Sequence, residues 1–168
     1  ELQVFSSTAG PEAFSPRPSP AIVDAASARV YPLTVWCEAI SGVTVERGGP
    51  RSFQVWGMED FDAERFCDEI PMEGGTARPT SCRMENGKAV PGAQWAVEVP
   101  REWRPVTNAV RLLCFLRDQL GGERLFAGPG ARPGFFDKLM GTDSIRLGLI
   151  SGAPSSELEE RMEHILRP

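Results

Sequence analysis

The chain has 168 residues and a formal net charge of −5, from 18 Lys or Arg and 23 Asp or Glu. Its 41% hydrophobic and 24% charged residues are typical of a folded globular protein and unlike those of a disordered one. The basic residues are scattered, and no apolar run approaches the roughly 20 residues of a membrane span, so neither nucleic acid nor a transmembrane helix is expected.

The N-terminal residues differ from the rest of the chain. Residues 1–20 are predicted to form an extended lead-in or linker, because prolines recur there and disfavour a regular helix. Within them, residues 2–5 alternate like a strand, which either pairs with this domain or ends a unit that precedes it. Residues 21–168 are predicted to form one domain, since a chain of this length suits a single core.

The first predicted elements after the lead-in are strands. Residues 28–37 are rich in Val, Tyr, Thr and Trp, and residues 52–56 alternate with a period of two. A turn at residues 46–51, which contains two arginines, separates them. A short helix is predicted over residues 60–69.

A hairpin is predicted next. Residues 76–83 form a candidate strand that Pro79 should interrupt, and residues 93–99 form its partner strand. The Asn86-Gly87 pair between them is a strong hairpin-turn signal, because both residues accept positive φ angles.

Helices dominate the second half of the chain. The clearest begins at Pro105 and ends before Gly121, with apolar residues at helical spacing. Ser156 and Glu159 have the spacing of a capping box for the last helix. The predicted helices cover residues 105–120, 135–140, 142–150 and 156–166. This order predicts an α+β fold, a mostly antiparallel sheet with helices on one face, rather than a doubly wound parallel sheet.

Four cysteines are spread singly along the chain. None forms the C-x-x-C spacing of a zinc knuckle, so no metal site is predicted. Cys37 and Cys114 lie in apolar runs and are expected in the core. Cys67 and Cys82 have more polar surroundings and would be able to pair in an oxidising compartment.

No catalytic constellation is evident. The one histidine, His164, is expected on the surface of the last helix, where it cannot complete a Ser-His-Asp or Cys-His arrangement. Carboxylates cluster at helix starts, where dipole compensation and solvation explain them. The loop at residues 128–134 lacks the Lys-Ser/Thr ending of a phosphate-binding loop. No catalytic residue and no cofactor are therefore predicted.

Glu38 stands apart from the other carboxylates. It follows Trp36 and Cys37 at the end of a predicted buried strand, where side chains commonly face a cleft. The next turn brings Arg47 and Arg51 back toward it, so we expect Glu38 within ion-pair reach of one of them at the rim of a concave surface. The group either lines a polar pocket or forms a structural salt bridge.

Aromatic residues offer a second kind of contact, since flat rings pack well on the axial C–H groups of sugars. Most of the tryptophans are nevertheless expected in the core. Around Trp95, the neighbouring Gln94 should face the opposite side of its strand. The aromatic set is Trp36, Trp56, Trp95, Trp103 and Tyr31.

Short motifs follow one another from about residue 18 to the end of the chain. They are Pro18-Ser19-Pro20, Tyr31-Pro32, Glu38, Arg47-Gly48 with Arg51 and Phe53, Arg78-Pro79, Gly92 with Gln94, Pro105 and its helix, Phe136-Asp137-Lys138-Leu139, Gly141-Thr142-Asp143 and Ile145-Arg146. In this order they resemble the smaller C-terminal domain of NamZ-type exo-β-N-acetylmuramidases, which are enzymes of peptidoglycan turnover.

The resemblance implies an accessory domain of a peptidoglycan-active glycosidase. In such relatives the domain packs beside a larger Rossmann-like domain that carries the catalytic carboxylate, and a muramic-acid-containing sugar binds between them. The chain would then have no acid–base chemistry of its own, and the implied location is the cell envelope or the exterior. The implied ligand contacts are Glu38, Arg47, Arg51, Arg78 and Gln94.

Several family positions differ in this chain. The family's Glu-Gly-Thr-Asn is Glu38-Ala39-Ile40-Ser41 here, its Ser-Glu-Gly is Thr44-Val45-Glu46, and the histidine after Gly-Val-Gln is Ala96. An alternative hypothesis is therefore a free-standing binding or protein-interaction module with a degenerate sugar site. A small stand-alone hydrolase ranks last, since nucleophile, base and orienting group cannot all be named.

Overall fold

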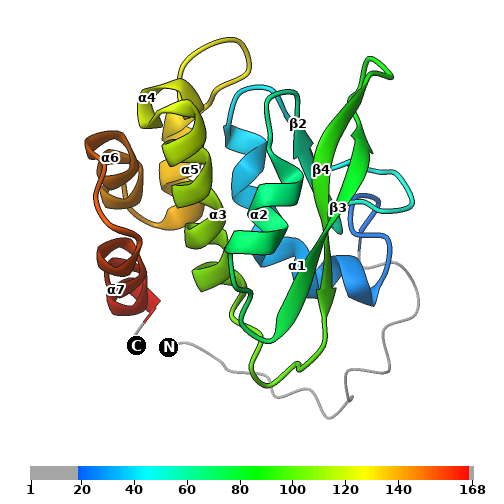
Figure 1. Cartoon of the computed structure of the whole chain (residues 1–168), viewed down its shortest axis with the longest axis horizontal. Coiled ribbons are helices and arrows are strands. Elements are labelled where there is room, and N and C mark those ends of the chain that lie inside the picture. The colour runs from blue at the N-terminus through cyan, green and yellow to red at the C-terminus, as the bar shows by residue number, and fades with distance from the viewer. Residues whose placement is uncertain (1–18, 167–168) are drawn as a thin grey trace, which may run out of the picture.

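A four-stranded antiparallel sheet with helices stacked on one face makes up the structure, a computed structural model described for residues 19–166 (Figure 1). From the sheet outward come α1 (Ala25–Thr34) and α2 (Ala63–Glu69), then α3 (Pro105–Leu120), then the remaining helices. This arrangement confirms the α+β prediction. The strand predicted at residues 2–5 and most of the predicted lead-in lie outside the described residues.

The sheet has the strand order β1-β2-β4-β3, and every neighbouring pair is antiparallel. The predicted hairpin is confirmed, with β3 and β4 joined through Asn86-Gly87, where Gly87 has a φ of 83°. The predicted interruption at Pro79 is wrong, because β3 is an edge strand, in which a residue without an N–H is tolerated. The strands are β1 (Val43–Thr44), β2 (Val55–Met58), β3 (Gly75–Arg83) and β4 (Ala89–Val97).

Residues 28–37 are helical, so the strand predicted there is wrong. They belong to α1 and to the 3₁₀ helix η2 (Val35–Ala39). Val30, Leu33 and Thr34, which follow helical spacing, are buried. The β-branched residues favour a strand locally, but packing against α3 and β4 overrides that weak preference.

Other predicted elements are present with shifted ends. The strand predicted at residues 52–56 begins only at Val55, after a turn. The helix predicted from residue 60 begins after Asp62, which caps it. Ser156 lies inside the last helix rather than at its cap. The remaining helices are α4 (Gly122–Leu125), α5 (Pro133–Met140), α6 (Ser144–Ser151) and α7 (Ser155–Leu166).

Asp24 caps the start of α1 and gives a testable prediction. Its carboxylate accepts hydrogen bonds from the Ser27 N–H at 2.7 Å and from the Gln54 amide at 3.1 Å. The Ser27 bond lowers the pKa of Asp24 below 3.8, so this stabilisation is present above that pH and is lost as the pH falls through the lowered pKa. We expect Asp24→Ala to cost about 1 kcal/mol of unfolding free energy at pH 7.

Urea unfolding at neutral and at acidic pH tests this assignment. The cost of Asp24→Ala should shrink as the pH falls through the lowered pKa of Asp24, because below it the carboxyl group is protonated in both the folded and the unfolded state. Asp24→Asn is the matched control, since asparagine keeps a capping oxygen without the charge. An equal cost of Asp24→Ala at both pH values would contradict the role of the charge.

An aromatic cluster fills the space between the sheet and the helices. Phe66 of α2 makes edge-on contacts with Trp95 of β4 and Phe115 of α3, at ring-centroid distances of 5.6 and 5.2 Å. Phe61 extends the cluster to Trp56, at 4.6 Å. The expectation that most tryptophans are core residues is confirmed. Buried tryptophans are Trp36, Trp56 and Trp95, whereas Trp103 is half-buried.

All four cysteines are free thiols, so the possible Cys67–Cys82 disulfide is absent. Cys37 and Cys114 are buried, as predicted. Cys82 is also buried, because it packs against Val90 across the hairpin. Burial raises the pKa of Cys67 to about 11 and that of Cys82 to about 12.

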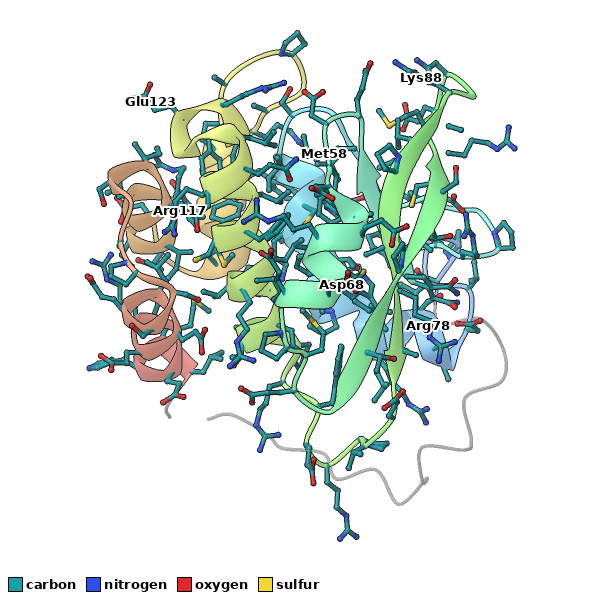
Figure 2. All side chains as sticks on the ribbon, viewed as in Figure 1. Met58, Asp68, Arg78, Lys88, Arg117 and Glu123 are labelled. Atoms are coloured by element: carbon teal, nitrogen blue, oxygen red, sulfur yellow. The ribbon has the colours of Figure 1, made fainter. Side chains whose placement is uncertain are left out.

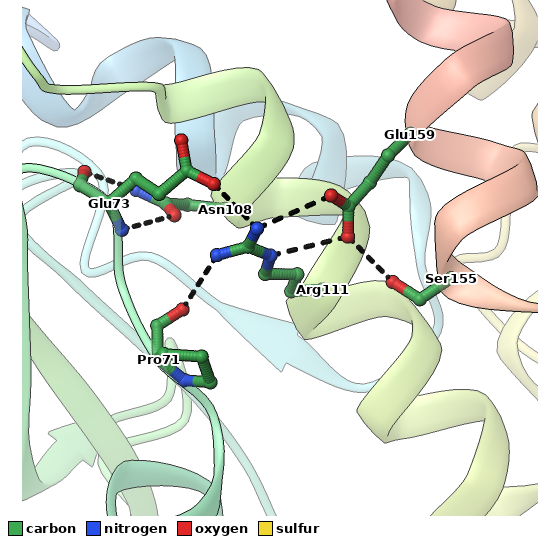
Figure 3. Close-up of polar contacts among 6 residues, drawn as sticks. All are labelled: Pro71, Glu73, Asn108, Arg111, Ser155 and Glu159. Atoms are coloured by element: carbon green, nitrogen blue, oxygen red, sulfur yellow. Dashed lines mark hydrogen bonds and ion pairs between the residues drawn. The ribbon is translucent and has the colours of Figure 1, made fainter.

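Arg111 on α3 joins the last helix to the loop before β3 (Figure 3). Its guanidinium donates to Glu73 Oε1 at 2.5 Å, to Glu159 Oε1 at 3.2 Å and to the Pro71 carbonyl at 3.1 Å. Ser155 donates to the same Glu159 carboxylate at 2.9 Å. These contacts hold α7 against α3, so this charged cluster stabilises the packing of the helices.

Candidate functional site

A cleft with a volume of about 960 Å³ opens where the hairpin end of the sheet meets two loops. Its lining residues come from the segments 42–51, 81–86 and 129–132, together with Glu38, Ile40 and Ala89. A volume of roughly 300–1,000 Å³ is usual for a small-molecule site. Three of the five predicted contact residues line the cleft, namely Glu38, Arg47 and Arg51.

Glu38 and Arg47 form the ion pair expected from the sequence. Arg47 Nη1 lies 3.2 Å from Glu38 Oε1. The predicted position of Glu38 at a strand end is wrong, because the residue lies in η2. The Glu38 side chain is 15% exposed and that of Arg47 is 64% exposed, so the pair runs from the wall of the cleft to its open mouth.

Because the Arg47 side chain is mostly exposed, its ion pair should add little to stability. Arg47→Ala is expected to cost no more than about 1 kcal/mol of unfolding free energy. Urea unfolding measures this cost, which should shrink further as salt screens the pair. A loss of about 3 kcal/mol would contradict the prediction and mean that Glu38 is left as an unpaired buried charge.

Arg132 enters the same cleft from a distant part of the chain and was not among the predicted contacts. Its Nη2 donates to the Glu38 carbonyl at 2.8 Å, and its guanidinium lies 4.5 Å from the centre of the Phe135 ring. Its backbone N–H donates to the Ala39 carbonyl at 2.9 Å. The one sequence signal for it is an arginine in the otherwise Gly- and Pro-rich loop at residues 128–134.

Arg51 is engaged in structural contacts. It donates to both carboxylate oxygens of Glu46, at 2.6 and 3.2 Å, and to the Ser81 carbonyl at 2.9 Å. Glu46 also accepts a hydrogen bond from the Arg83 N–H at 2.9 Å. These bonds attach the loop after β1 to the free edge of β3, so Arg51 and Glu46 form part of the cleft wall.

Arg78 and Gln94 do not line the cleft. They are direct partners across β3 and β4, and both are exposed. Gln94 faces the opposite side of the strand from the buried Trp95, as predicted. Figure 2 shows Arg78 on the side of the sheet away from α3. The predicted contact residues therefore fall into two separate groups.

A second cavity of about 580 Å³ adjoins the cleft. The two cavities share Gly42, Met84 and Asn86 in their linings. The charged side chains that line the second cavity are paired with one another. The second cavity therefore has no arginine without a carboxylate partner, whereas the cleft does. Its ion pairs are Lys88–Glu59 and Arg124–Asp60.

Positive charge is in excess in the cleft, although the chain as a whole is acidic. An anionic ligand is therefore favoured there over a cationic one. The arginines of the lining are Arg47, Arg51, Arg83 and Arg132, and its carboxylates are Glu38, Glu46 and Glu85.

The thiol that lines the cleft is not suited to act as a nucleophile at neutral pH. Cys82 is this thiol, and burial followed by the charge of Glu46 raises the pKa of Cys82 to about 12, so the thiol stays protonated. His164 is exposed on α7, outside the lining. Over residues 19–166, no group of three or more His, Cys, Asp or Glu side chains is placed to hold a metal ion.

None of the helices described between residues 19 and 166 has both the length and the apolar character needed to cross a bilayer.

Comparison with known proteins places the chain in a family. Residues 29–167 match the family described as "Exo-beta-N-acetylmuramidase NamZ, C-terminal", whereas no curated protein matches the chain. A crystal structure of a DUF1343 family protein from Bacteroides fragilis NCTC 9343 is similar, with a TM-score of 0.67 and 18% identity, which shows a shared fold. That similarity covers 89% of this chain and 44% of the solved chain. Because the family match extends over most of its length, the chain belongs to the family of the C-terminal domain of the exo-β-N-acetylmuramidase NamZ.

Proposed function

We propose that this chain is the accessory, substrate-contacting domain of a peptidoglycan-active glycosidase of the exo-β-N-acetylmuramidase type. A Rossmann-like partner domain would supply the catalytic carboxylate, and the cleft would contact a sugar that contains muramic acid. One observation carries the proposal: in a member of this family, the predicted contacts Glu38 and Arg47 line a cleft of the size of a small-molecule site.

The chemistry of the cleft favours contact with a ligand over catalysis. Glycoside hydrolysis generally requires two carboxyl groups placed on either side of the scissile bond. Of the three carboxylates that line this cleft, Glu38 is paired with Arg47 and Glu46 with Arg51, so among the described residues only Glu85 has no ion-pair partner. The cleft is therefore expected to bind a sugar without cleaving it.

Titration of the ¹⁵N-labelled chain with N-acetylmuramic acid tests the binding half of the proposal. We expect amide shifts to concentrate at Glu38, Arg47 and residues 130–132, and Arg47→Ala to weaken binding. Arg101→Ala is the matched control, because Arg101 is an exposed arginine that does not line the cleft. Shifts confined to other surfaces would contradict the proposed site.

A chromogenic muramide tests the catalytic half. The isolated chain should release no chromophore, because the catalytic carboxylate is assigned to the partner domain. Turnover that survives purification and disappears in Glu38→Gln would overturn the accessory role.

Arg78 and Gln94 lie outside the cleft, so a different contact is proposed for them. Their shared, exposed position on β3 and β4 suits contact with the partner domain or with a more distant part of the ligand. Arg78→Ala should then leave N-acetylmuramic acid binding by the isolated chain unchanged.

A free-standing interaction module with a degenerate sugar site is the second candidate function. It is favoured by the structural use of Arg51 and Glu46, whose polar groups are taken up by the wall of the cleft. A folded chain that shows no shifts with N-acetylmuramic acid would support this candidate over the first.

A further inference from the structure

The four arginines of the cleft differ in how their charges are balanced. Arg47 is paired with Glu38, and Arg51 is paired with Glu46. The contacts of the Arg132 guanidinium are with a backbone carbonyl and an aromatic ring, neither of which carries a net charge. Arg132 is therefore an oriented guanidinium whose positive charge has no carboxylate partner among the described residues.

Arg132 differs from Arg83, the other lining arginine without a carboxylate partner, because contacts hold the Arg132 guanidinium in one orientation. Arg132 is held by its Nη2 bond to the Glu38 carbonyl, by the Phe135 ring and by its own backbone bond to Ala39. No such contact fixes the guanidinium of Arg83 among residues 19–166. An oriented guanidinium loses less side-chain entropy when it binds an anion.

The loop that carries Arg132 is itself attached to the segment that follows η2. The Ser41 hydroxyl donates to the Pro129 carbonyl at 2.8 Å, and Ser41 N–H lies 3.4 Å from the Leu125 carbonyl. A guanidinium has five N–H donors, and the carbonyl of Glu38 uses one of them. The remaining donors are sufficient for two parallel hydrogen bonds to a carboxylate.

Muramic acid differs from glucosamine by a lactyl ether that ends in a carboxylate. We infer that Arg132 binds this carboxylate and gives the cleft its preference for N-acetylmuramic acid over N-acetylglucosamine. The inference rests on the proposed function, because it assigns a specificity-determining residue to the same sugar site. Arg47, whose charge Glu38 already balances, contributes to both sugars alike.

Affinities for the two sugars, measured by NMR titration of the full chain, test the inference. Wild type should bind N-acetylmuramic acid at least about tenfold more tightly than N-acetylglucosamine, as a charge-assisted bidentate contact allows. Arg132→Ala should remove that preference and leave N-acetylglucosamine binding unchanged. Arg132→Lys should keep part of it, because an ammonium group retains the charge without the bidentate fork.

Arg132→Gln separates the charge from the structural bond. Glutamine keeps an N–H donor but carries no charge, so a loss of preference equal to that in Arg132→Ala assigns the effect to the charge. A preference for N-acetylmuramic acid that survives in Arg132→Ala overturns the inference, as does an equal loss for both sugars. Failure of wild type to bind either sugar overturns the proposed function as well, so the two failures are distinguishable.

Discussion

Gly92→Ala is expected to lower the free energy of unfolding by about 3 kcal/mol and to distort one wall of the cleft. Gly92 of β4 is flanked by Gly57 of β2 and Thr80 of β3. A methyl group there would be forced against the Trp56 carbonyl and the Cys82 sulfur. Both neighbours belong to strands paired with β4, so the clash can be relieved only if the strands of the sheet move. Since Cys82 lines the cleft, the shift should reach the proposed binding site.

Urea unfolding measures this cost, and amide NMR shifts report whether the change reaches residues 81–86. Gly134→Ala is the matched control, because its added methyl group meets no atom within 4 Å apart from its chain neighbours and the backbone of its own helix, and alanine favours the helix. Adding Cys82→Ala to Gly92→Ala should recover only part of the loss, since the Trp56 carbonyl remains in place. A Gly92→Ala chain as stable as wild type would refute the close approach of these strands.

Glu46→Gln is expected to cost about 2 kcal/mol or more of unfolding free energy. The Glu46 side chain is 11% exposed and accepts hydrogen bonds from Arg51 and from the Arg83 N–H. An amide group removes the balancing charge and replaces one acceptor with a donor that faces other donors. The contact between the loop and the edge of β3 is then weakened, and with it one wall of the cleft.

Thermal and urea unfolding measure the effect, with Arg47→Ala as the comparison for an exposed pair. The double variant Glu46→Gln, Arg51→Gln should be more stable than the sum of the two single changes implies, because neither charge is then left without its partner. Additive costs would mean that Glu46 and Arg51 do not act as a pair.

Signals that act over a few residues determined the parts of the fold that the sequence predicts correctly. The turn at Asn86-Gly87 sets the hairpin, and Pro105 with the glycine at position 121 sets the ends of α3. Glu38 and Arg47 are only nine residues apart, so a single reversal of the chain is enough to pair them. The order of short motifs was likewise sufficient to indicate the family, which the match over residues 29–167 confirms.

Only the tertiary structure decided the conformation of residues 28–37. Their β-branched and aromatic composition favours a strand, but the preference is weak compared with the burial gained when Val30, Leu33 and Thr34 pack as a helix. Because this segment is helical, Glu38 lies in η2 and not at the end of a strand, where the sequence predicted it.

The composition of the candidate site was likewise decided by contacts between distant segments. Arg132 reaches the Glu38 carbonyl across 94 residues, and no local pattern reports such a pairing. Arg78 and Gln94 pair with each other across the hairpin but lie outside the cleft. Spacing and propensity describe a few neighbouring residues, whereas the partners of a side chain depend on which remote segments the packed core brings beside it.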